Sequence, residues 1–250
     1  MTRLKGSDLS RVALRTPLLQ ATWNYERQQG LGWALALEPV IDRLYPDPTE
    51  RRLRLAEHTA YFNTQPTFAS LALGAVASLE EARAEGHGPS GEGIARIKAV
   101  MGSALAALGD RLFWSTLRPF AACLGVLLAL DGSWIGAAAL WLSYNAVHLL
   151  VRYRGVRWGY VQGPAVLDDV LRRRVSGFVR WLALAGSALV GVVVAEMLVP
   201  GGQPRLVSFQ VLLAGGLALG IIAAQRSRPS PTQWALGLGG LCALATWFHA

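Results

Sequence analysis

The chain has 250 residues, of which 52% are hydrophobic and only 16% charged, whereas an ordinary soluble domain has about 25% charged residues. This composition excludes a disordered regulator, and two cysteines are too few for a disulfide-built secreted domain. The net charge is +8, and the excess lies after residue 110, where 12 arginines accompany four acidic residues among the most apolar segments. No nucleic-acid-binding motif accompanies that charge, so we expect no nucleic acid as a partner. Arginines beside apolar segments are typical of the cytoplasmic side of a membrane, and we therefore expect an all-α, polytopic membrane protein.

The first segment, residues 1–20, contains no apolar run that could be a signal peptide, because basic residues interrupt it. Ser7 can cap a short helix that places Leu9, Val12 and Ala13 on one side and arginines on the other. This pattern predicts an interfacial amphipathic helix lying on the membrane. The alternative is an ordinary surface helix that packs on its own domain.

Residues 21–118 are predicted to form an amphipathic and re-entrant helical region. Helices are expected around 22–43, 49–61 and 93–108, and the prolines of YPDP at 45–48 should end the first of them. The apolar segment 66–79 is short for a bilayer span and suits a buried or re-entrant helix. Glycines and a proline predict a loop over 85–93.

Residues 119–151 carry no charge except Asp131. One helix of that length would exceed the roughly 30 Å hydrocarbon core, so we expect a helical hairpin broken at 131–133. The basic segment 152–180 should lie in the cytoplasm. For residues 181–250 we expect a C-terminal group of transmembrane helices, with spans at 181–199 and 206–224 and a further apolar stretch at 233–248.

No catalytic constellation is recognisable in the sequence. The spacing of the histidines matches no known site; His58 is interpreted as a surface or capping residue and His148 as an internal hydrogen-bonding residue. Both cysteines lie in apolar runs, where a thiol usually acts as a small hydrophobe. We therefore expect a non-catalytic chain without metal or cofactor.

Three clusters of polar and aromatic residues are candidates for ligand binding. In the first, Asn63-Thr64-Gln65-Pro66, the amides of Asn63 and Gln65 can both donate and accept hydrogen bonds, as sugar hydroxyls require, and Pro66 would start a helix. A plain polar turn is the alternative for these four residues.

The second cluster is Trp23-Asn24-Tyr25-Glu26-Arg27, where Asn24 and Arg27 would share one side of a helix and form a polar network with Glu26. The third contains Gly109, Asp110 and Trp114, in which a carboxylate stands close to an indole. A solvated helix face is the alternative for the second cluster. For the third it is helix capping by Asp110, with Trp114 as a core residue or interfacial anchor.

Together with these clusters, longer stretches of the chain resemble the IID component of mannose-type (mannose/fructose/sorbose) phosphotransferase systems. The matching stretches follow the family order over nearly the whole chain. They are LLQATWNYERQQGLGW at 18–33, the YP near 45, HTAYFNTQP at 58–66, LEEARAEG at 79–86, IKAVMGSALAALGDRLFW at 97–114 followed by STLRP with Arg118, and RYRGVRWGY at 152–160.

The resemblance implies a subunit of a sugar permease in the bacterial cytoplasmic (inner) membrane, multi-pass and with a cytoplasmic N-terminus. It implies a IIC membrane partner, soluble IIB and IIA proteins that relay phosphate from phosphoenolpyruvate, and a trimer of IIC–IID heterodimers. It implies that Asn63 and Gln65 contact a hexose, and less directly Asn24, Glu26, Asp110 and Trp114. The residues Thr64, Pro66, Trp23, Arg27, Gly109 and Arg118 complete the matching motifs.

Four positions depart from the family pattern, because Ser103 and Arg111 replace prolines while Ala107 and Ser115 replace glycines. Such changes favour helix and predict a straighter, stiffer segment. They leave open an alternative function, a structural or regulatory membrane protein derived from the family that no longer moves sugar. Restoring proline at Arg111 would alter a working carrier and leave such a scaffold unaffected.

Overall fold

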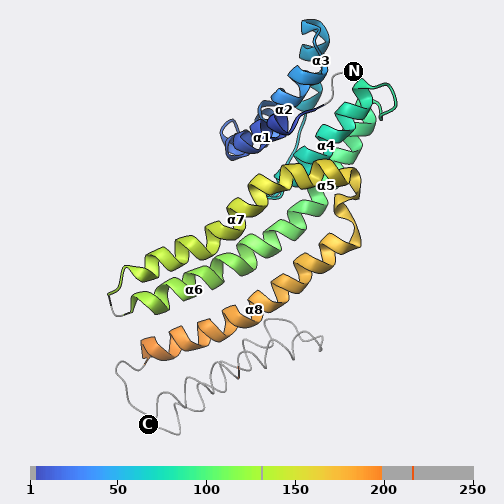
Figure 1. Cartoon of the computed structure of the whole chain (residues 1–250). Coiled ribbons are helices and arrows are strands. Elements are labelled where there is room, and N and C mark those ends of the chain that lie inside the picture. The colour runs from blue at the N-terminus through green and yellow to red at the C-terminus, as the bar shows by residue number, and fades with distance from the viewer. Residues whose placement is uncertain (1–3, 131, 199–215, 217–250) are drawn as a thin grey trace.

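The computed structural model describes residues 4–130, 132–198 and 216, and within them the secondary structure is helical, with isolated bridges at Asn24, Gln28 and Phe62 (Figure 1). The elements in chain order are α1 (Gly6–Arg15), η1 (Thr16–Gln20), α2 (Gly30–Leu44), α3 (Pro48–His58), α4 (Ala69–Ala84), α5 (Gly91–Gly109), η2 (Asp110–Leu117), α6 (Arg118–Ala129), α7 (Ile135–Gln162), η3 (Gly163–Leu167) and α8 (Asp169–Leu198).

Helices α1 to α4 surround a core at one end of the molecule, against which α5 and the second half of α7 pack. Helix α4 is its centre: Leu71, Leu73 and Val76 are essentially inaccessible, and apolar residues occupy its whole circumference. The expectation of a buried helix at 66–79 is therefore confirmed. Helix α1 buries Leu9 and Val12 in the same core, as the packing alternative for this segment requires.

The largest helical contact joins α4 to α7, and it depends on glycine. A Cβ atom added to Gly74 would lie 2.0 Å from the Val156 carbonyl oxygen, and one added to Gly159 would lie 2.0 Å from the Leu71 carbonyl oxygen. At Gly155 the nearest atom would be Ser70 Oγ, at 2.1 Å. The two helix backbones thus approach more closely than any larger residue would allow.

A long hairpin extends from this core. Helices α5, η2 and α6 continue one another from Gly91 to Ala129, and α7 returns beside α6, with α8 along the same layer (Figure 1). The hairpin turns just before α7, where Gly132 has a φ of +77°, so the expected break at 131–133 is confirmed. Its arms are longer than expected, because α6 continues η2 and α7 runs on to Gln162.

Two helices in the described part of the chain are long and apolar enough to cross a membrane, Gly91–Ala129 and Arg173–Val194. The far end of the hairpin exposes large apolar side chains, among them Val126, Trp134 and Leu142. Such a surface fits lipid or a membrane partner rather than water.

One expected boundary was wrong, because helix α2 begins at Gly30 and not near 22. The basic segment 152–180 comprises the end of α7, η3 and the start of α8, with Arg152 buried at 7% exposure. Its cytoplasmic position stays a prediction. The expected span at 181–199 falls largely within α8. The span expected at 206–224 and the stretch at 233–248 lie outside the described residues, apart from Gly216, which is helical.

Candidate functional site

The turn formed by Asn63, Thr64, Gln65 and Pro66 is fixed to two other parts of the fold. The Gln29 side chain donates from Nε2 to the Thr64 carbonyl oxygen at 2.7 Å and accepts from the Thr64 amide at 3.1 Å. Thr64 Oγ1 donates to the carbonyl oxygen of Gly102 on α5 at 2.8 Å. Both Gln29 and Thr64 are buried, so this turn has one fixed position between α2 and α5.

The two amides of the turn have different surroundings. Gln65 is only 4% exposed, and its Oε1 accepts the Thr67 amide at 2.8 Å and the Phe68 amide at 2.9 Å, which satisfies the start of α4. Asn63 is exposed, and its side chain has no hydrogen-bond partner among the residues that the structure describes. The Asn63 amide is therefore exposed, whereas the Gln65 side chain is held in hydrogen bonds at the start of α4. A sugar contact by either residue stays a prediction.

The second predicted cluster is a turn and not a helix face. Asn24 Oδ1 accepts the Arg27 amide at 2.8 Å, and Gln28 has a φ of +51°, so the chain folds back on itself before α2. The amide of Gln29 then donates to the Phe62 carbonyl oxygen at 2.8 Å, directly before Asn63. The expected helical spacing of Asn24 and Arg27 was wrong, yet the turn brings this cluster beside the first one.

Charged and aromatic residues of this second turn remain largely open to their surroundings. Glu26 lies 3.6 Å from Arg27 Nε, and its side chain is 82% exposed. The Trp23 ring contacts the exposed Tyr25 ring edge-on, with centroids 5.0 Å apart.

The third predicted cluster meets the first through Gly109. A Cβ atom at that position would lie 2.5 Å from Gln65 Cβ, so only glycine allows α5 to approach the turn this closely. One turn further on, the Arg118 guanidinium lies 5.2 Å from the Trp114 ring centroid, and both residues line a cavity of about 530 Å³ with Tyr144 and Asn145. Asp110 is exposed on the same helical segment.

A line of contacts joins the turn to this cavity. Thr67 Oγ1 lies 2.9 Å from His148 Nδ1, and the His148 ring stacks on Tyr144 with centroids 5.7 Å apart. The interpretation of His148 as an internal hydrogen-bonding residue is confirmed. The Phe113 ring packs edge-on against the rings of Phe68, Tyr144 and His148.

The four departures from the family pattern, Ser103, Ala107, Arg111 and Ser115, are all exposed. The helix that carries them has no break, but it widens into a π-helix over Asp110–Leu117, where Thr116 Oγ1 donates to the Arg111 carbonyl oxygen at 2.7 Å. The four side chains share the exposed surface of this segment with Asp110, Trp114 and Arg118.

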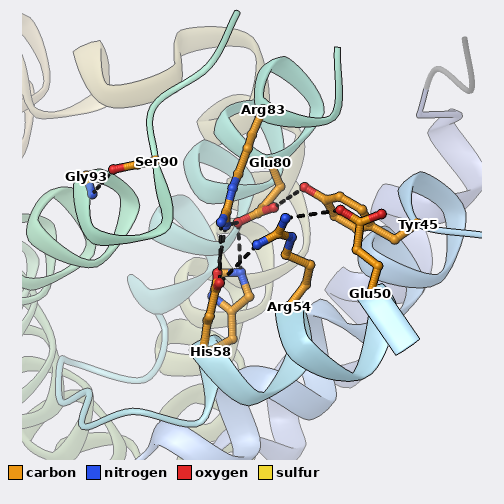
Figure 2. A network of polar contacts seen from close by, with 9 residues as sticks. Tyr45, Glu50, Arg54, His58, Glu80, Arg83, Ser90 and Gly93 are labelled. Carbon is orange, nitrogen blue, oxygen red and sulfur yellow. Dashed lines mark hydrogen bonds and ion pairs between the residues drawn. The ribbon is translucent and has the colours of Figure 1, made fainter. Parts of the chain in front are cut away.

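A network of charged groups that the sequence did not reveal joins the end of α2 to α3 and α4. Glu80 is inaccessible; its Oε1 lies 3.2 Å from His58 Nε2 and its Oε2 accepts the Tyr45 hydroxyl at 2.7 Å (Figure 2). Arg83 joins Glu80 to Glu57, and Arg54 joins Glu57 to Glu50 (Figure 2). The expectation of a surface position for His58 was wrong, because His58 is only 3% exposed.

Burial and hydrogen bonding shift the pKa values of Glu80 and His58 in opposite directions. Burial acts to raise the pKa of Glu80, but hydrogen bonds from His58 and Tyr45 and the charge of Arg83 bring that pKa below its usual value. Burial lowers the pKa of His58 even though the Glu80 carboxylate acts in the other direction. At neutral pH, therefore, a charged Glu80 accepts hydrogen bonds from a neutral His58 and from Tyr45.

Lys98 connects the segment of His58 to the residues just before Asn63. Lys98 of α5 is 5% exposed; its Nζ donates to the His58 carbonyl oxygen at 3.0 Å and lies 4.8 Å from the Trp33 ring centroid and 5.2 Å from that of Phe62. Phe62 precedes Asn63 directly, so the Lys98 side chain lies between His58 and the segment that carries the exposed amide.

Comparisons with known proteins agree with this geometry. The family model described as "PTS system mannose/fructose/sorbose family IID component" matches residues 3–200. The chain is 38% identical over 198 residues to the mannose-specific EIID component of Escherichia coli (strain K12), an alignment that covers 79% of this chain and 68% of that protein. It is 30% identical over 259 residues to the sorbose-specific EIID component of Klebsiella pneumoniae, covering 96% and 94% of the two chains.

A solved structure is similar over almost the whole length. A chain in the cryo-EM structure of the mannose transporter ManYZ in complex with microcin E492 superposes with a TM-score of 0.63 at 30% identity, covering 97% of this chain and 98% of that chain. The overall arrangement of the helices is therefore that of a membrane transporter subunit.

Proposed function

The chain belongs to the IID components of the mannose/fructose/sorbose family of phosphotransferase systems, and from that premise we propose that it forms, with a IIC subunit, the path along which a hexose crosses the membrane. Uptake would be coupled to phosphorylation of the sugar at the expense of phosphoenolpyruvate. One observation carries the proposal: the turn at Asn24–Gln29, the turn at Asn63–Pro66 and Gly109 meet at one place although they lie far apart in the sequence.

We place the IIC subunit on the exposed surface of α5, η2 and α6, which carries Asp110, Arg111, Trp114 and Arg118. The similarity to a chain of the ManYZ transporter supports a membrane partner, and the exposed charged and aromatic residues are our reason for choosing this surface. The assembly would be a trimer of such heterodimers in the bacterial inner membrane, with the N-terminus and the docking face for the IIB protein in the cytoplasm.

The sugar contacts that we propose begin with Asn63, whose exposed amide can donate to one hydroxyl and accept from another. Trp114 would cover the C–H face of the ring, beside Arg118 in the cavity of about 530 Å³. Asn24, Glu26 and Asp110 remain candidates at the edge of this region, and Gln65 would shape the turn. Phosphoryl transfer would take place on the IIA and IIB proteins, so this chain would bind sugar without reacting with it.

Replacing Asn63 with alanine tests the site. A hydrogen bond to an uncharged group contributes about 1 kcal/mol, so the half-saturating sugar concentration for uptake should rise roughly three- to tenfold. The measurement is uptake of radiolabelled hexose by cells that contain the whole system. Gln162→Ala, which removes an exposed amide at the end of α7, is the matched control and should leave the half-saturating sugar concentration unchanged. Undiminished uptake by the Asn63 variant would remove this residue from the site.

A further inference from the structure

A second hollow, a groove of about 1280 Å³, lies between α1 and α7 and shares no lining residue with the cavity at Trp114. Its walls are mainly apolar, and Leu14, Leu150 and Val161 are each more than half exposed there. Pockets for small ligands usually measure about 300–1000 Å³ and enclose the ligand, whereas this groove is larger and open along its length. Its shape fits a long amphiphile better than a single sugar.

Three cations line the same groove without an acidic counterpart. Lys5 precedes α1, and Arg154 and Arg157 lie on α7; all three are exposed and form no ion pair within the described part of the chain. No Asp or Glu belongs to the lining. Two carboxylates lie close by: Glu81 accepts hydrogen bonds from the Leu4 amide and the Tyr160 hydroxyl, and the buried Asp8 accepts one from the Lys5 amide and lies 3.9 Å from Arg43 Nε. Within the described residues, neither carboxylate forms an ion pair with the three cations.

Aromatic residues stand beside these cations. Tyr153 and Trp158 are 41% and 43% exposed in the groove, on the part of α7 that follows its uncharged first half. Tyrosine and tryptophan favour the headgroup region of a bilayer, where basic residues also meet lipid phosphates. The groove therefore combines an apolar wall with aromatic and basic side chains, which matches the acyl chains and the charged headgroup of a phospholipid.

We propose that this groove is a binding site for one anionic phospholipid, with acyl chains along Leu9, Leu14 and Leu150 and the phosphate at Lys5, Arg154 and Arg157. The bound lipid would connect α1 to α7 and so hold the N-terminal helix at the membrane surface. An uncharged sugar would leave the three cations without a counter-charge, and a free phosphate would leave the apolar wall unused. The inference does not depend on the proposed sugar path.

Native mass spectrometry of the full-length chain can measure this binding with phosphatidylglycerol and with phosphatidylcholine of identical acyl chains. We expect phosphatidylglycerol to bind at least about tenfold more tightly. The double variant Arg154→Gln/Arg157→Gln should bind it roughly thirtyfold more weakly, since each basic residue near an anionic surface contributes about a fivefold factor. The matched control, Arg52→Gln/Arg96→Gln, removes two exposed arginines from α3 and α5 and should bind as the unmodified chain does.

Several outcomes would overturn the proposal. They are equal affinity for the two lipids, unchanged binding by the groove variant, an equal loss in the control variant, and displacement of the lipid by an equal concentration of inorganic phosphate. A groove variant that keeps its lipid and loses binding to the IIB protein would instead assign these arginines to protein docking. None of these results bears on sugar uptake through the Asn63 region, so the two proposals fail separately.

Discussion

Glu80→Ala is expected to lower the free energy of unfolding by about 3–5 kcal/mol, the usual effect of removing one partner from a buried ionic network. The variant leaves His58 and the Tyr45 hydroxyl without their shared acceptor, and Arg83 without one of its two carboxylates. Because Glu80 is inaccessible, water cannot replace the lost hydrogen bonds. Thermal unfolding of the purified protein in detergent measures the effect as a large fall in Tm.

Glu57→Ala is the matched control, since it removes a carboxylate of the same network whose side chain is 32% exposed. We expect a smaller destabilisation there, about 1–2 kcal/mol, because water can reach the partly exposed Glu57 position and solvate the two arginines. If Glu80→Ala unfolded at the temperature of the unmodified chain, the network would have no part in stability.

The network should also make the protein less stable in acid. The pKa of His58 lies below its usual 6.5 in the folded chain, so the unfolded chain binds more protons as the pH falls through 6.5, and stability decreases. The pKa of Glu80 is also lowered, so its contribution is present above about pH 4.5 and is lost as the pH falls through the folded value. His58→Gln should remove the first of these two steps and retain the second.

Gly159→Ala is expected to destabilise the contact between α4 and α7 by about 3 kcal/mol, the upper end of the usual cost of overpacking. The new Cβ would lie 2.0 Å from the Leu71 carbonyl oxygen, and a helix backbone cannot move aside as a flexible side chain can. The helices would have to separate, and the turn at Asn63–Pro66 would lose its fixed position next to α4. Thermal unfolding and the yield of intact protein in detergent both report this effect.

Gly177→Ala provides the control for the helix propensity of alanine, because nothing lies within 4 Å of a Cβ at that position of α8. Alanine there should stabilise the helix slightly, by up to about 1 kcal/mol. Equal stability of the two alanine variants would contradict the close packing of α4 on α7.

Local signals in the sequence predicted several elements well. Helix α2 ends at Leu44, directly before the YPDP segment whose prolines predicted its end. The glycine at position 132 marks the turn of the hairpin, and the apolar run at 66–79 forms the buried α4. In each case the determining residues are neighbours in the chain.

The remaining features depend on contacts between distant residues. Asn24 begins a turn that ends at Gln28, and Gln28 forms a bridge with Phe62. The local pattern predicted a helix that does not form there, because the partner of the turn is distant in the sequence. Tyr45, His58 and Glu80 come from three elements, and no spacing along the chain brings them together. Arg152 is the first residue of the basic stretch 152–180, and the sequence alone does not show that α7 continues through it and buries it at 7% exposure.

The same limit applies to the candidate site. The motifs provided candidate residues, but they did not predict that Gln65 would be turned inward to hydrogen-bond at the start of α4. They also did not predict that Trp114 and Arg118 would line a cavity with Tyr144. Those details depend on how α5 and α7 pack around the turn at Asn63–Pro66. The residues of the turn alone do not determine that packing.

The most direct measurement of the central claim is sugar uptake by cells that lack their own mannose-type system and receive the IIA, IIB and IIC proteins with or without this chain. With labelled mannose, fructose and sorbose as probes, we expect at least one of them to be taken up and phosphorylated only when this chain is present. Equal accumulation of sugar phosphate in its absence, or none of the three taken up with the complete set of proteins, would contradict its role as part of the sugar path.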